Sequence, residues 1–240
     1  AGAIKVWPIK VTLSPDKTTE SVKLTNETDK LVNLQVSATS WDIDENGEFI
    51  ESDTGDFVFF PRLITVPPGE DKAVRVGYQG DFPRLEKPYR LIIEELPPVL
   101  EPDQQENKKR VGVQYVLRLS LPLFVMPGER PPAPEIGIDG IRVSENGVQV
   151  GVKAAGTHHV EVTKVEGTLL GAGDRKLASA EQQPRLLRVL PERRVFVDMP
   201  LNTTVCGQAQ SMLVKVHAKG LEAPYEQKVP LAAGRCREAP

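Results

Sequence analysis

The chain is poor in cysteine, in histidine and in net charge. Its 240 residues include two cysteines and three histidines, and 30 basic side chains nearly balance 33 acidic ones, which leaves a net charge of −3. Such a balance lacks the basic surface typical of nucleic-acid-binding proteins, so no nucleic-acid partner is predicted. No apolar run approaches the roughly 18 residues of a membrane-spanning helix, so no membrane insertion is predicted either.

Motifs for catalysis and cofactor binding are also missing. The sequence contains no Gly-Lys-Ser/Thr phosphate loop, no Gly-x-Ser-x-Gly nucleophile elbow and no Cys-x-x-Cys pair. The adjacent His158 and His159 would point to opposite faces of a strand, so together they are poor ligands for one metal ion. We therefore expect no enzyme activity, no cofactor and no metal site.

What the chain has in quantity is turn-forming residues, 21 prolines and 19 glycines, placed between short apolar stretches. Alternating apolar and polar residues bounded by such turns are typical of β-strands. Asn46-Gly47 stands between two apolar runs and is a strong hairpin signal. No amphipathic helix of ten or more residues is recognisable. We expect strands at residues 5–13, 20–25, 31–41, 57–65, 71–78, 89–96, 111–125, 141–143, 147–153, 159–170, 185–190, 194–199, 212–217 and 225–231.

A proline-rich stretch from Pro127 to Pro134 lies near the middle of the chain. Such a stretch favours a linker, and 240 residues suit two domains of about 120 better than one large core. We predict an all-β protein made of two immunoglobulin-like β-sandwich domains, over residues 1–127 and 128–240.

The segment from Val111 to Val125 has an apolar residue at every odd-numbered position. Because strands usually have about five or six residues, we expect part of this segment to run beyond its own sheet's core. Pro122 lies inside the run, and since proline cannot donate a backbone hydrogen bond, it favours an edge strand. A long apolar edge is a template for a strand from another chain.

The two cysteines, Cys206 and Cys236, both fall in the last 35 residues. This placement allows a disulfide within one domain, and two separate buried thiols are the alternative. We predict the disulfide, which would imply an oxidising compartment.

Several segments, taken in their order, resemble the PapD-like periplasmic chaperones that assemble pili by the chaperone–usher route. They are residues 8–15, Phe60-Pro61-Arg62-Leu63, Pro68-Gly69 followed by Val74-Arg75-Val76, residues 89–98 and residues 121–125. The resemblance implies two immunoglobulin-like domains set at an angle, a periplasmic location and no nucleotide. It also implies two kinds of partner, which are pilus or fimbrial subunits and an outer-membrane usher.

The resemblance further implies donor-strand complementation, in which the chaperone lends an edge strand to a subunit that lacks one. Aligned on the end of the strand, the donated residues fall on Val113, Tyr115 and Leu117, with Val111 as a fourth. We expect Leu123 and Val125, by contrast, to pack into the domain's own core. Without a subunit, the same edge is expected to support self-association.

The family anchors the free carboxylate of the subunit with one basic residue from the first strand and another from the last. Lys10 matches the first position, whereas Pro122 stands where a lysine is expected at the second. Arg90 and Arg118 are the replacement candidates, and a solvated surface charge is the alternative for either. We favour Arg90, because a neighbouring strand can face the same site.

Arg75 and Glu86 match positions that the family uses in an inter-domain ion pair. The function implied is that of a periplasmic chaperone that binds, folds and caps pilus subunits and delivers them to the usher. The alternative is a two-domain immunoglobulin-like adhesin or surface-binding module, whose long strand serves only its own core.

Overall fold

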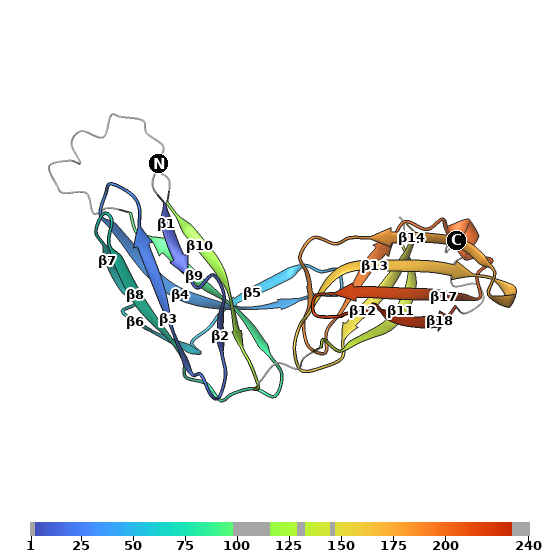
Figure 1. Ribbon diagram of the computed structural model, residues 1–240, viewed down its shortest axis with the longest axis horizontal. Coiled ribbons are helices and arrows are strands. Elements are labelled where there is room, and N and C mark those ends of the chain that lie inside the picture. Colours follow the sequence, from blue (N-terminus) through green and yellow to red (C-terminus); the bar gives the residue numbers. More distant parts are fainter. Residues whose placement is uncertain (1–2, 98–115, 129–132, 145–146, 232–240) are drawn as a thin grey trace. The chain divides into compact units, whose positions relative to one another are not determined.

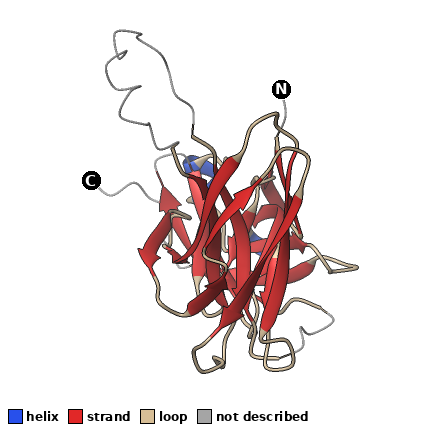
Figure 2. Ribbon diagram, turned by 90° about the vertical axis from the view of Figure 1, so that its left-hand side faces the viewer, coloured by secondary structure: helices blue, strands red, loops and turns tan. Residues whose placement is uncertain are grey.

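The structure is a computed structural model that describes residues 3–97, 116–128, 133–144 and 147–231. Strands dominate it, and the described helices are two short ones, the 3-10 helix η1 (Ala172–Asp174) and the α-helix α2 (Thr203–Cys206) (Figure 2). The prediction of an all-β protein is confirmed.

Contacts divide the chain into two compact units. The first consists of Ala1–Trp41, Glu51–Pro83 and Lys87–Gly128, and the second consists of Asp42–Ile50, Arg84–Glu86 and Glu129–Pro240. The division along the chain falls at Gly128, inside the proline-rich stretch, but two short segments of the N-terminal half pack with the second unit. Alternation of residue types cannot predict such an exchange, because it depends on contacts between distant segments.

The first unit contains two sheets, of four and six strands (Figure 1). The four-stranded sheet has the order β1-β3-β8-β6, and the six-stranded sheet has the order β2-β10-β9-β4-β5, with β7 also paired to β4. The strands are β1 (Ile4–Trp7), β2 (Val11–Leu13), β3 (Thr19–Asn26), β4 (Val32–Ile43), β5 (Phe49–Asp53), β6 (Phe57–Phe60), β7 (Leu63–Val66), β8 (Asp71–Tyr78), β9 (Lys87–Glu95) and β10 (Arg118–Val125).

Two segments that we predicted as single strands are divided in the structure. Residues 5–13 form β1, which pairs with β3 in one sheet, and β2, which pairs with β10 in the other. Residues 57–65 form β6 and β7, which also belong to different sheets. A cis peptide precedes a proline at each division, at Trp7–Pro8 and at Phe60–Pro61.

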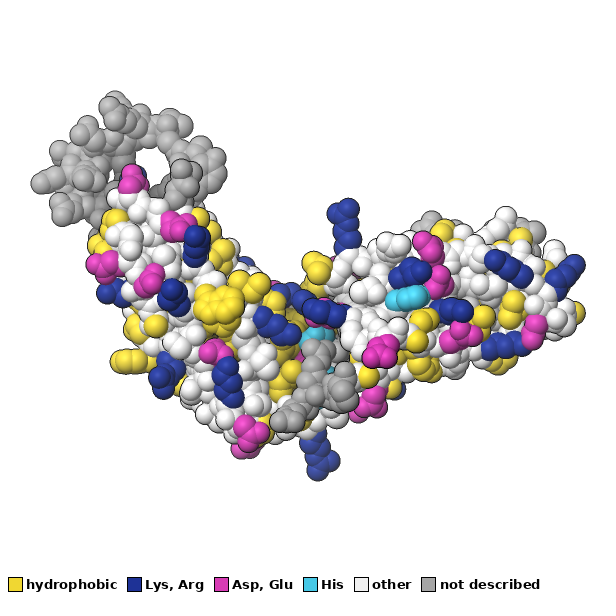
Figure 3. All heavy atoms as spheres, viewed as in Figure 1, with side chains coloured by type: hydrophobic (Ala, Val, Ile, Leu, Met, Phe, Trp, Pro, Cys, Tyr) yellow, Lys and Arg dark blue, Asp and Glu magenta, His cyan; other side chains and the backbone are white. Residues whose placement is uncertain are grey.

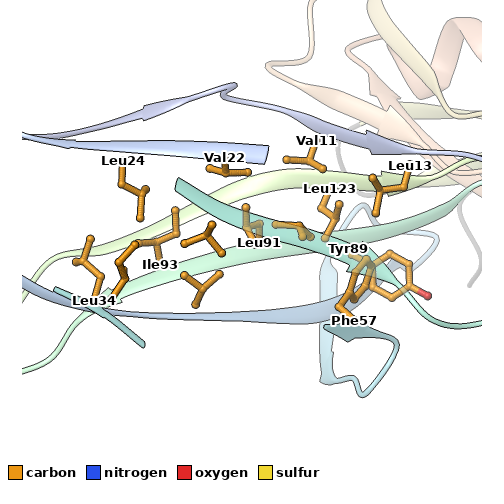
Figure 4. Close-up of a cluster of buried hydrophobic side chains, with 14 of the residues drawn as sticks. Val11, Leu13, Val22, Leu24, Leu34, Phe57, Tyr89, Leu91, Ile93 and Leu123 are labelled. Atoms are coloured by element: carbon orange, nitrogen blue, oxygen red, sulfur yellow. The ribbon is translucent and has the colours of Figure 1, made fainter. Parts of the chain in front are cut away.

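The core of the first unit lies between its two sheets (Figure 4). Val22 and Leu24 of β3 are buried opposite Leu91 of β9 and Leu123 of β10. Val22 and Leu24 both face this core because every second side chain of a strand points to the same face. Burying one such side chain contributes about 1.5–3 kcal/mol to stability. Tyr89 is buried with them, and its hydroxyl donates to Asp56 Oδ2 at 2.6 Å. Burial raises the pKa of that hydroxyl, and the bond to Asp56 raises it further.

The second unit also contains two sheets, ordered β11-β12-β16 and β14-β13-β17-β18, with β15 paired to β13. Its core is rich in valine, as expected for half-buried strands. The strands are β11 (Ile136–Ser144), β12 (Gly147–Ala154), β13 (Val160–Leu170), β14 (Lys176–Gln182), β15 (Leu187–Val189), β16 (Arg194–Met199), β17 (Ser211–Ala218) and β18 (Tyr225–Pro230).

The hairpin predicted at Asn46-Gly47 is present between β4 and β5. Gly47 has a φ of +87°, and its N–H donates to the carbonyl oxygen of Asp44 at 3.1 Å. The same turn belongs to the second unit, where Asp42 accepts two hydrogen bonds from the Arg193 guanidinium, at 3.0 and 2.6 Å. Burial raises the pKa of Asp42, but the hydrogen bonds from Arg193 and from the Ile43 N–H, together with the charge of Arg193, outweigh burial and leave that pKa below its ordinary value.

Two strands of the structure, β5 and β14, lie outside the predicted strand ranges. Five neighbouring residues of β5 are all exposed, and β14 has no fully buried side chain, so neither carries the apolar alternation that identified the others. Among the described residues, no helix is long and apolar enough to cross a membrane.

Candidate functional site

The last strand of the first unit, β10, changes from an inner strand to an edge strand along its length. It pairs antiparallel with β9 from Arg118 to Val125, but the parallel partner β2 reaches only Leu123, Phe124 and Val125 (Figure 1). Within the described part of the chain, no strand pairs with Arg118–Pro122 on the side away from β9. Pro122 is thus the last residue of the unpaired stretch, which agrees with its predicted edge character.

The burial of β10 side chains follows the predicted alternation from Arg118 to Leu121, whereas Leu123, Phe124 and Val125 are all buried. Leu123 and Val125 are fully buried in the core, as expected. Leu119 and Leu121 are partly buried and pack against the same core from its margin. The apolar face of β10 therefore becomes more exposed towards its N-terminal end, where the other donor-strand candidates Val111, Val113 and Tyr115 lie outside the described residues.

Leu117, the last of those candidates, immediately precedes β10. Its carbonyl oxygen accepts a hydrogen bond from the Glu95 N–H at 2.8 Å, so the pairing with β9 continues one residue past the assigned strand. Its side chain is partly buried and lines a hollow together with Ile4, Leu31 and Leu96.

Lys10, Pro122 and Arg90 lie in one row across three neighbouring strands. Pro122 is opposite Arg90 in the β9–β10 pairing, and Lys10 directly precedes Val11, which is opposite Leu123. Because Val11 and Leu123 face the core, the row faces away from it. The structure therefore brings Lys10 and Arg90 to the two sides of Pro122 on the outer face of the sheet.

Each of these two cations lies over an aromatic ring. Lys10 Nζ is 5.2 Å from the centre of the Phe124 ring, and the Arg90 guanidinium carbon is 5.3 Å from the centre of the Trp41 ring. Cation–π contacts of this kind contribute about 0.5–2 kcal/mol and hold the cation in place. Phe124 and Trp41 are both buried, although neither belongs to the core between the sheets.

Phe124 and Trp41 were not singled out in the sequence. The sequence does contain a signal for Phe124. It is a large apolar residue at an even-numbered position, on the face that alternation assigns to polar residues. A large aromatic side chain on the face of the sheet that points away from the core indicates a covered or functional surface.

Arg118, the other candidate, lies two rows away on the same face. It is opposite Glu94, and its Nε donates to Glu94 Oε1 at 2.8 Å. About half of its side chain, 54%, is exposed. Arg118 therefore already has a carboxylate partner within its own sheet.

The other predicted site residues lie away from this row. Arg75 is exposed on β8 of the first unit, whereas Glu86 is buried in the second unit and contacts His159. The ion pair between Arg75 and Glu86 would join the two units and stays a prediction. Cys206 is buried and disulfide-bonded, and Cys236 lies outside the described residues.

Hydrophobic side chains also reach the surface near the row. Figure 3 shows them gathered on the first unit in the region of β1 and β2, with basic side chains beside them. Trp7, the last residue of β1, and Ile9, in the segment between β1 and β2, are both about two-thirds exposed, at 68% and 67%. Exposed apolar surface beside basic groups is typical of a surface that binds another protein.

No group of three or more histidine, cysteine, aspartate or glutamate residues in the described ranges has the geometry of a metal site. Both histidines of the 158–159 pair are buried, and each contacts a side chain of its own unit.

Comparison with solved structures finds the same two-unit fold in pilus chaperones. The chain is similar to one in the CsuC–CsuE chaperone–tip subunit complex of Acinetobacter baumannii, with 16% identity, 94% of this chain and 97% of that chain covered, and a TM-score of 0.62. It is similar to the class 5 fimbriae chaperone CfaA, with 16% identity and a TM-score of 0.65. The match covers 95% of this chain and 100% of that chain. A third similar structure is the Salmonella enterica SafA pilin–SafB chaperone complex, with 15% identity and a TM-score of 0.55. The match covers 96% of this chain and 97% of that chain.

At such identities these structures support the fold alone, and no curated protein sequence matches the chain. A family model does match it, over residues 3–130, which include both β1–β10 and the row at Pro122. That model represents the PapD N-terminal domain of pili and flagellar-assembly chaperones. The chain belongs to this family of pilus-assembly chaperones.

Proposed function

We propose that this chaperone caps pilus subunits in the periplasm by lending them the edge of β10 and the segment before it, and then delivers them to an outer-membrane usher. The observation that carries the proposal is the stretch Arg118–Pro122, which has β9 on one side and no described strand on the other. The family is one of assembly chaperones, which are not enzymes.

A strand with one free edge can complete the sheet of another protein. Its backbone N–H and C=O groups satisfy unpaired groups of the partner, and its alternate side chains fill the partner's apolar groove, as in chaperone–pilin complexes generally. The donated side chains proposed here are Val111, Val113, Tyr115 and Leu117. If fully buried, each would remove apolar surface from water worth about 1.5–3 kcal/mol.

The partner proposed is a pilus subunit whose sandwich lacks a strand. Similar solved structures include the complexes of CsuC with CsuE and of SafB with SafA, which are chaperones bound to pilus subunits. Leu117, which is partly buried just before β10, is the described side chain that such a subunit would cover, while Leu119 and Leu121 pack against the home core.

Lys10 and Arg90 are proposed to bind the C-terminal carboxylate of the subunit. They lie in one row on either side of Pro122, so a carboxylate seated over Pro122 would accept hydrogen bonds from both cations. Arg118 is the weaker candidate, because it lies two rows away from Pro122 on β10. Binding at this row would fix the register of the subunit strand along β10.

Co-expression with a pilin-like subunit from the same genome tests the proposal. We expect the two proteins to be recovered as a one-to-one complex and the subunit to aggregate when it is expressed alone. A subunit that is equally soluble with and without the chaperone, and never co-purifies with it, would contradict the proposal.

A further inference from the structure

A row of aromatic side chains lies beside the row at Pro122 on the outer face of the six-stranded sheet. Phe124 of β10 is opposite Pro88 of β9, two residues along from Pro122 and therefore on the same face. The pairing of β4 with β9 ends one residue before Trp41, and its register brings Trp41 level with Pro88 on the other side of β9. Trp41 and Phe124 thus lie on the two sides of Pro88, as the two cations lie on the two sides of Pro122.

Each ring is a diagonal neighbour of one cation. Arg90 of β9 is opposite the residue of β4 that stands two positions before Trp41. In the same way, the direct partner of Phe124 on β2 stands two positions after Lys10. Diagonal neighbours on one face of a sheet are close enough for aromatic and long side chains to touch. The pairing register of the sheet therefore brings about both cation–π contacts, at 5.3 Å for Arg90 and 5.2 Å for Lys10.

The two rings are fixed, whereas the cations reach the surface. Trp41 is 4% exposed and Phe124 is 1% exposed, so packing holds each ring in one position. Lys10 is exposed and Arg90 is partly exposed. Long cationic side chains lose much conformational freedom when a ligand orders them. A cation that is already held against a fixed ring loses less of that freedom on binding.

Contact with a ring also leaves the charge of the cation in place. A ring attracts a cation through the negative face of its π-system and carries no net charge, so it does not neutralise the cation as a carboxylate would. A cation held in this way keeps its attraction for the carboxylate of a ligand. The aromatic row therefore orders the cations without competing for what they would bind.

We propose that Trp41 and Phe124 are positioning residues of the site for the subunit carboxylate. They act through Arg90 and Lys10, which they hold on the two sides of Pro122 before a subunit arrives. This role rests on the proposed function, because it requires that the two cations bind the subunit carboxylate. Since both rings are buried in the chaperone, neither has to touch the subunit, and the loss of a ring should affect binding only while its cation is present.

A double-mutant cycle on Trp41 and Arg90 tests this role, read as the dissociation constant of the full-length chaperone with a purified pilus subunit. We expect Trp41→Leu to raise the dissociation constant about two- to thirtyfold, the range that a cation–π contact spans. Trp41→Phe keeps an aromatic ring and should raise it less. In an Arg90→Ala background Trp41→Leu should have no further effect, because the ring then has no cation to hold.

An Arg118→Ala background is the matched control, because it removes the same charge from the same face, and Trp41→Leu should keep its full effect there. An equal effect of Trp41→Leu with and without Arg90 would show that Trp41 acts only on the fold, and would overturn the positioning role. If Arg90→Ala by itself leaves the dissociation constant unchanged, the proposed carboxylate site fails instead, and the positioning role fails with it.

Should Trp41→Leu fail to fold, a fluorinated tryptophan takes its place in the cycle. The chain has two tryptophans, so in a Trp7→Phe protein a tryptophan fluorinated on its benzene ring enters at position 41 alone. Fluorine withdraws electron density from the face of the ring and weakens its attraction for a cation, while the shape of the ring changes little. Fluorination should raise the dissociation constant when Arg90 is present and leave it unchanged in Arg90→Ala. The same dissociation constant with and without fluorine, in the presence of Arg90, would overturn the positioning role.

Discussion

Arg90 and Arg118 have the same charge and lie on neighbouring strands, yet their surroundings differ. The Arg90 guanidinium lies over Trp41 and is opposite Pro122, whereas Arg118 donates to Glu94. The side chain of Pro122 has no hydrogen-bond acceptor and no charge, so it cannot pair with Arg90 in place of a bound carboxylate.

Arg90→Ala should weaken capture of a pilus subunit while changing the thermal stability of the chaperone little. Removing one cation from a hydrogen-bonded charge pair at an interface typically costs about 2–5 kcal/mol of binding free energy. The measurement is the dissociation constant of the purified complex, together with the melting temperature of the free chaperone.

Arg118→Ala is the matched variant for this experiment. It removes the same charge from the same face of the sheet, and we expect it to change subunit affinity much less. If Arg118→Ala weakens capture and Arg90→Ala does not, the anchor has been assigned to the wrong arginine.

The hydrogen bonds of Asn26 show which contacts of a single residue the sequence does not predict. Asn26 is the last residue of β3, and its Oδ1 accepts from the Thr28 N–H at 2.9 Å in the turn that follows. Its Nδ2, however, donates to the carbonyl oxygens of Lys30 and Val66, at 2.7 and 2.8 Å, and the side chain is fully buried. The bond to Val66 links residues 40 positions apart, and no local pattern contains that information.

Among the secondary-structure elements, β10 carries the proposed function. Alternation predicted its two faces correctly, since Leu123 and Val125 are buried and Leu119 and Leu121 lie at the margin. The point at which it becomes an edge strand depends on where β2 begins, and therefore on the division of residues 5–13 into two strands. That division depends on pairing partners, which alternation does not specify.

Leu117→Asp should abolish subunit capture and leave the chaperone folded. Leu117 is partly buried at the margin of its own unit, but in the proposed complex it would enter an apolar groove, where an unpaired carboxylate is strongly unfavourable. Co-purification with the subunit and circular dichroism of the free variant measure the two effects.

Val116→Asp introduces the same charge one residue earlier. Val116 is exposed in the free chaperone, with 52% of its surface accessible, and a strand would point it to the opposite face from Leu117. We expect near-normal capture for this variant. Normal capture by Leu117→Asp would instead remove Leu117 from the donated strand.

At the scale of the whole molecule, Arg118–Pro122 forms a sheet edge with which no strand in the described part of the chain pairs. An unpaired apolar edge tends to associate with a second copy of itself. We predict self-association that increases with protein concentration, measured by sedimentation or by size-exclusion chromatography with light scattering. A strictly monomeric protein at the highest accessible concentration would contradict this prediction.

Pairing with a pilus subunit and self-association would use the same edge, so they should compete. Addition of a subunit should therefore convert self-associated chaperone into a one-to-one complex. A ternary species that contains two chaperones and one subunit would indicate that self-association uses another surface.

The two-domain architecture was predictable from the sequence, because proline-rich residues near the midpoint divide two series of alternating strands. The membership of Asp42–Ile50 and Arg84–Glu86 in the second unit was not. Those segments are held by side chains such as Arg193 and His159, which lie more than seventy residues further along the chain. The resemblance in the N-terminal half located Lys10 and Arg90, but the aromatic rings beneath them required the structure.

The position of Trp41 under Arg90 gives the chaperone an internal optical reporter. The chain has two tryptophans, of which Trp7 is 68% exposed and Trp41 is 4% exposed. In a Trp7→Phe protein, emission would come from Trp41 alone, 5.3 Å from the cation proposed to bind the subunit carboxylate. Occupation of that cation would change the electric field at the indole, so the arrival of a subunit could be followed in real time without any attached dye.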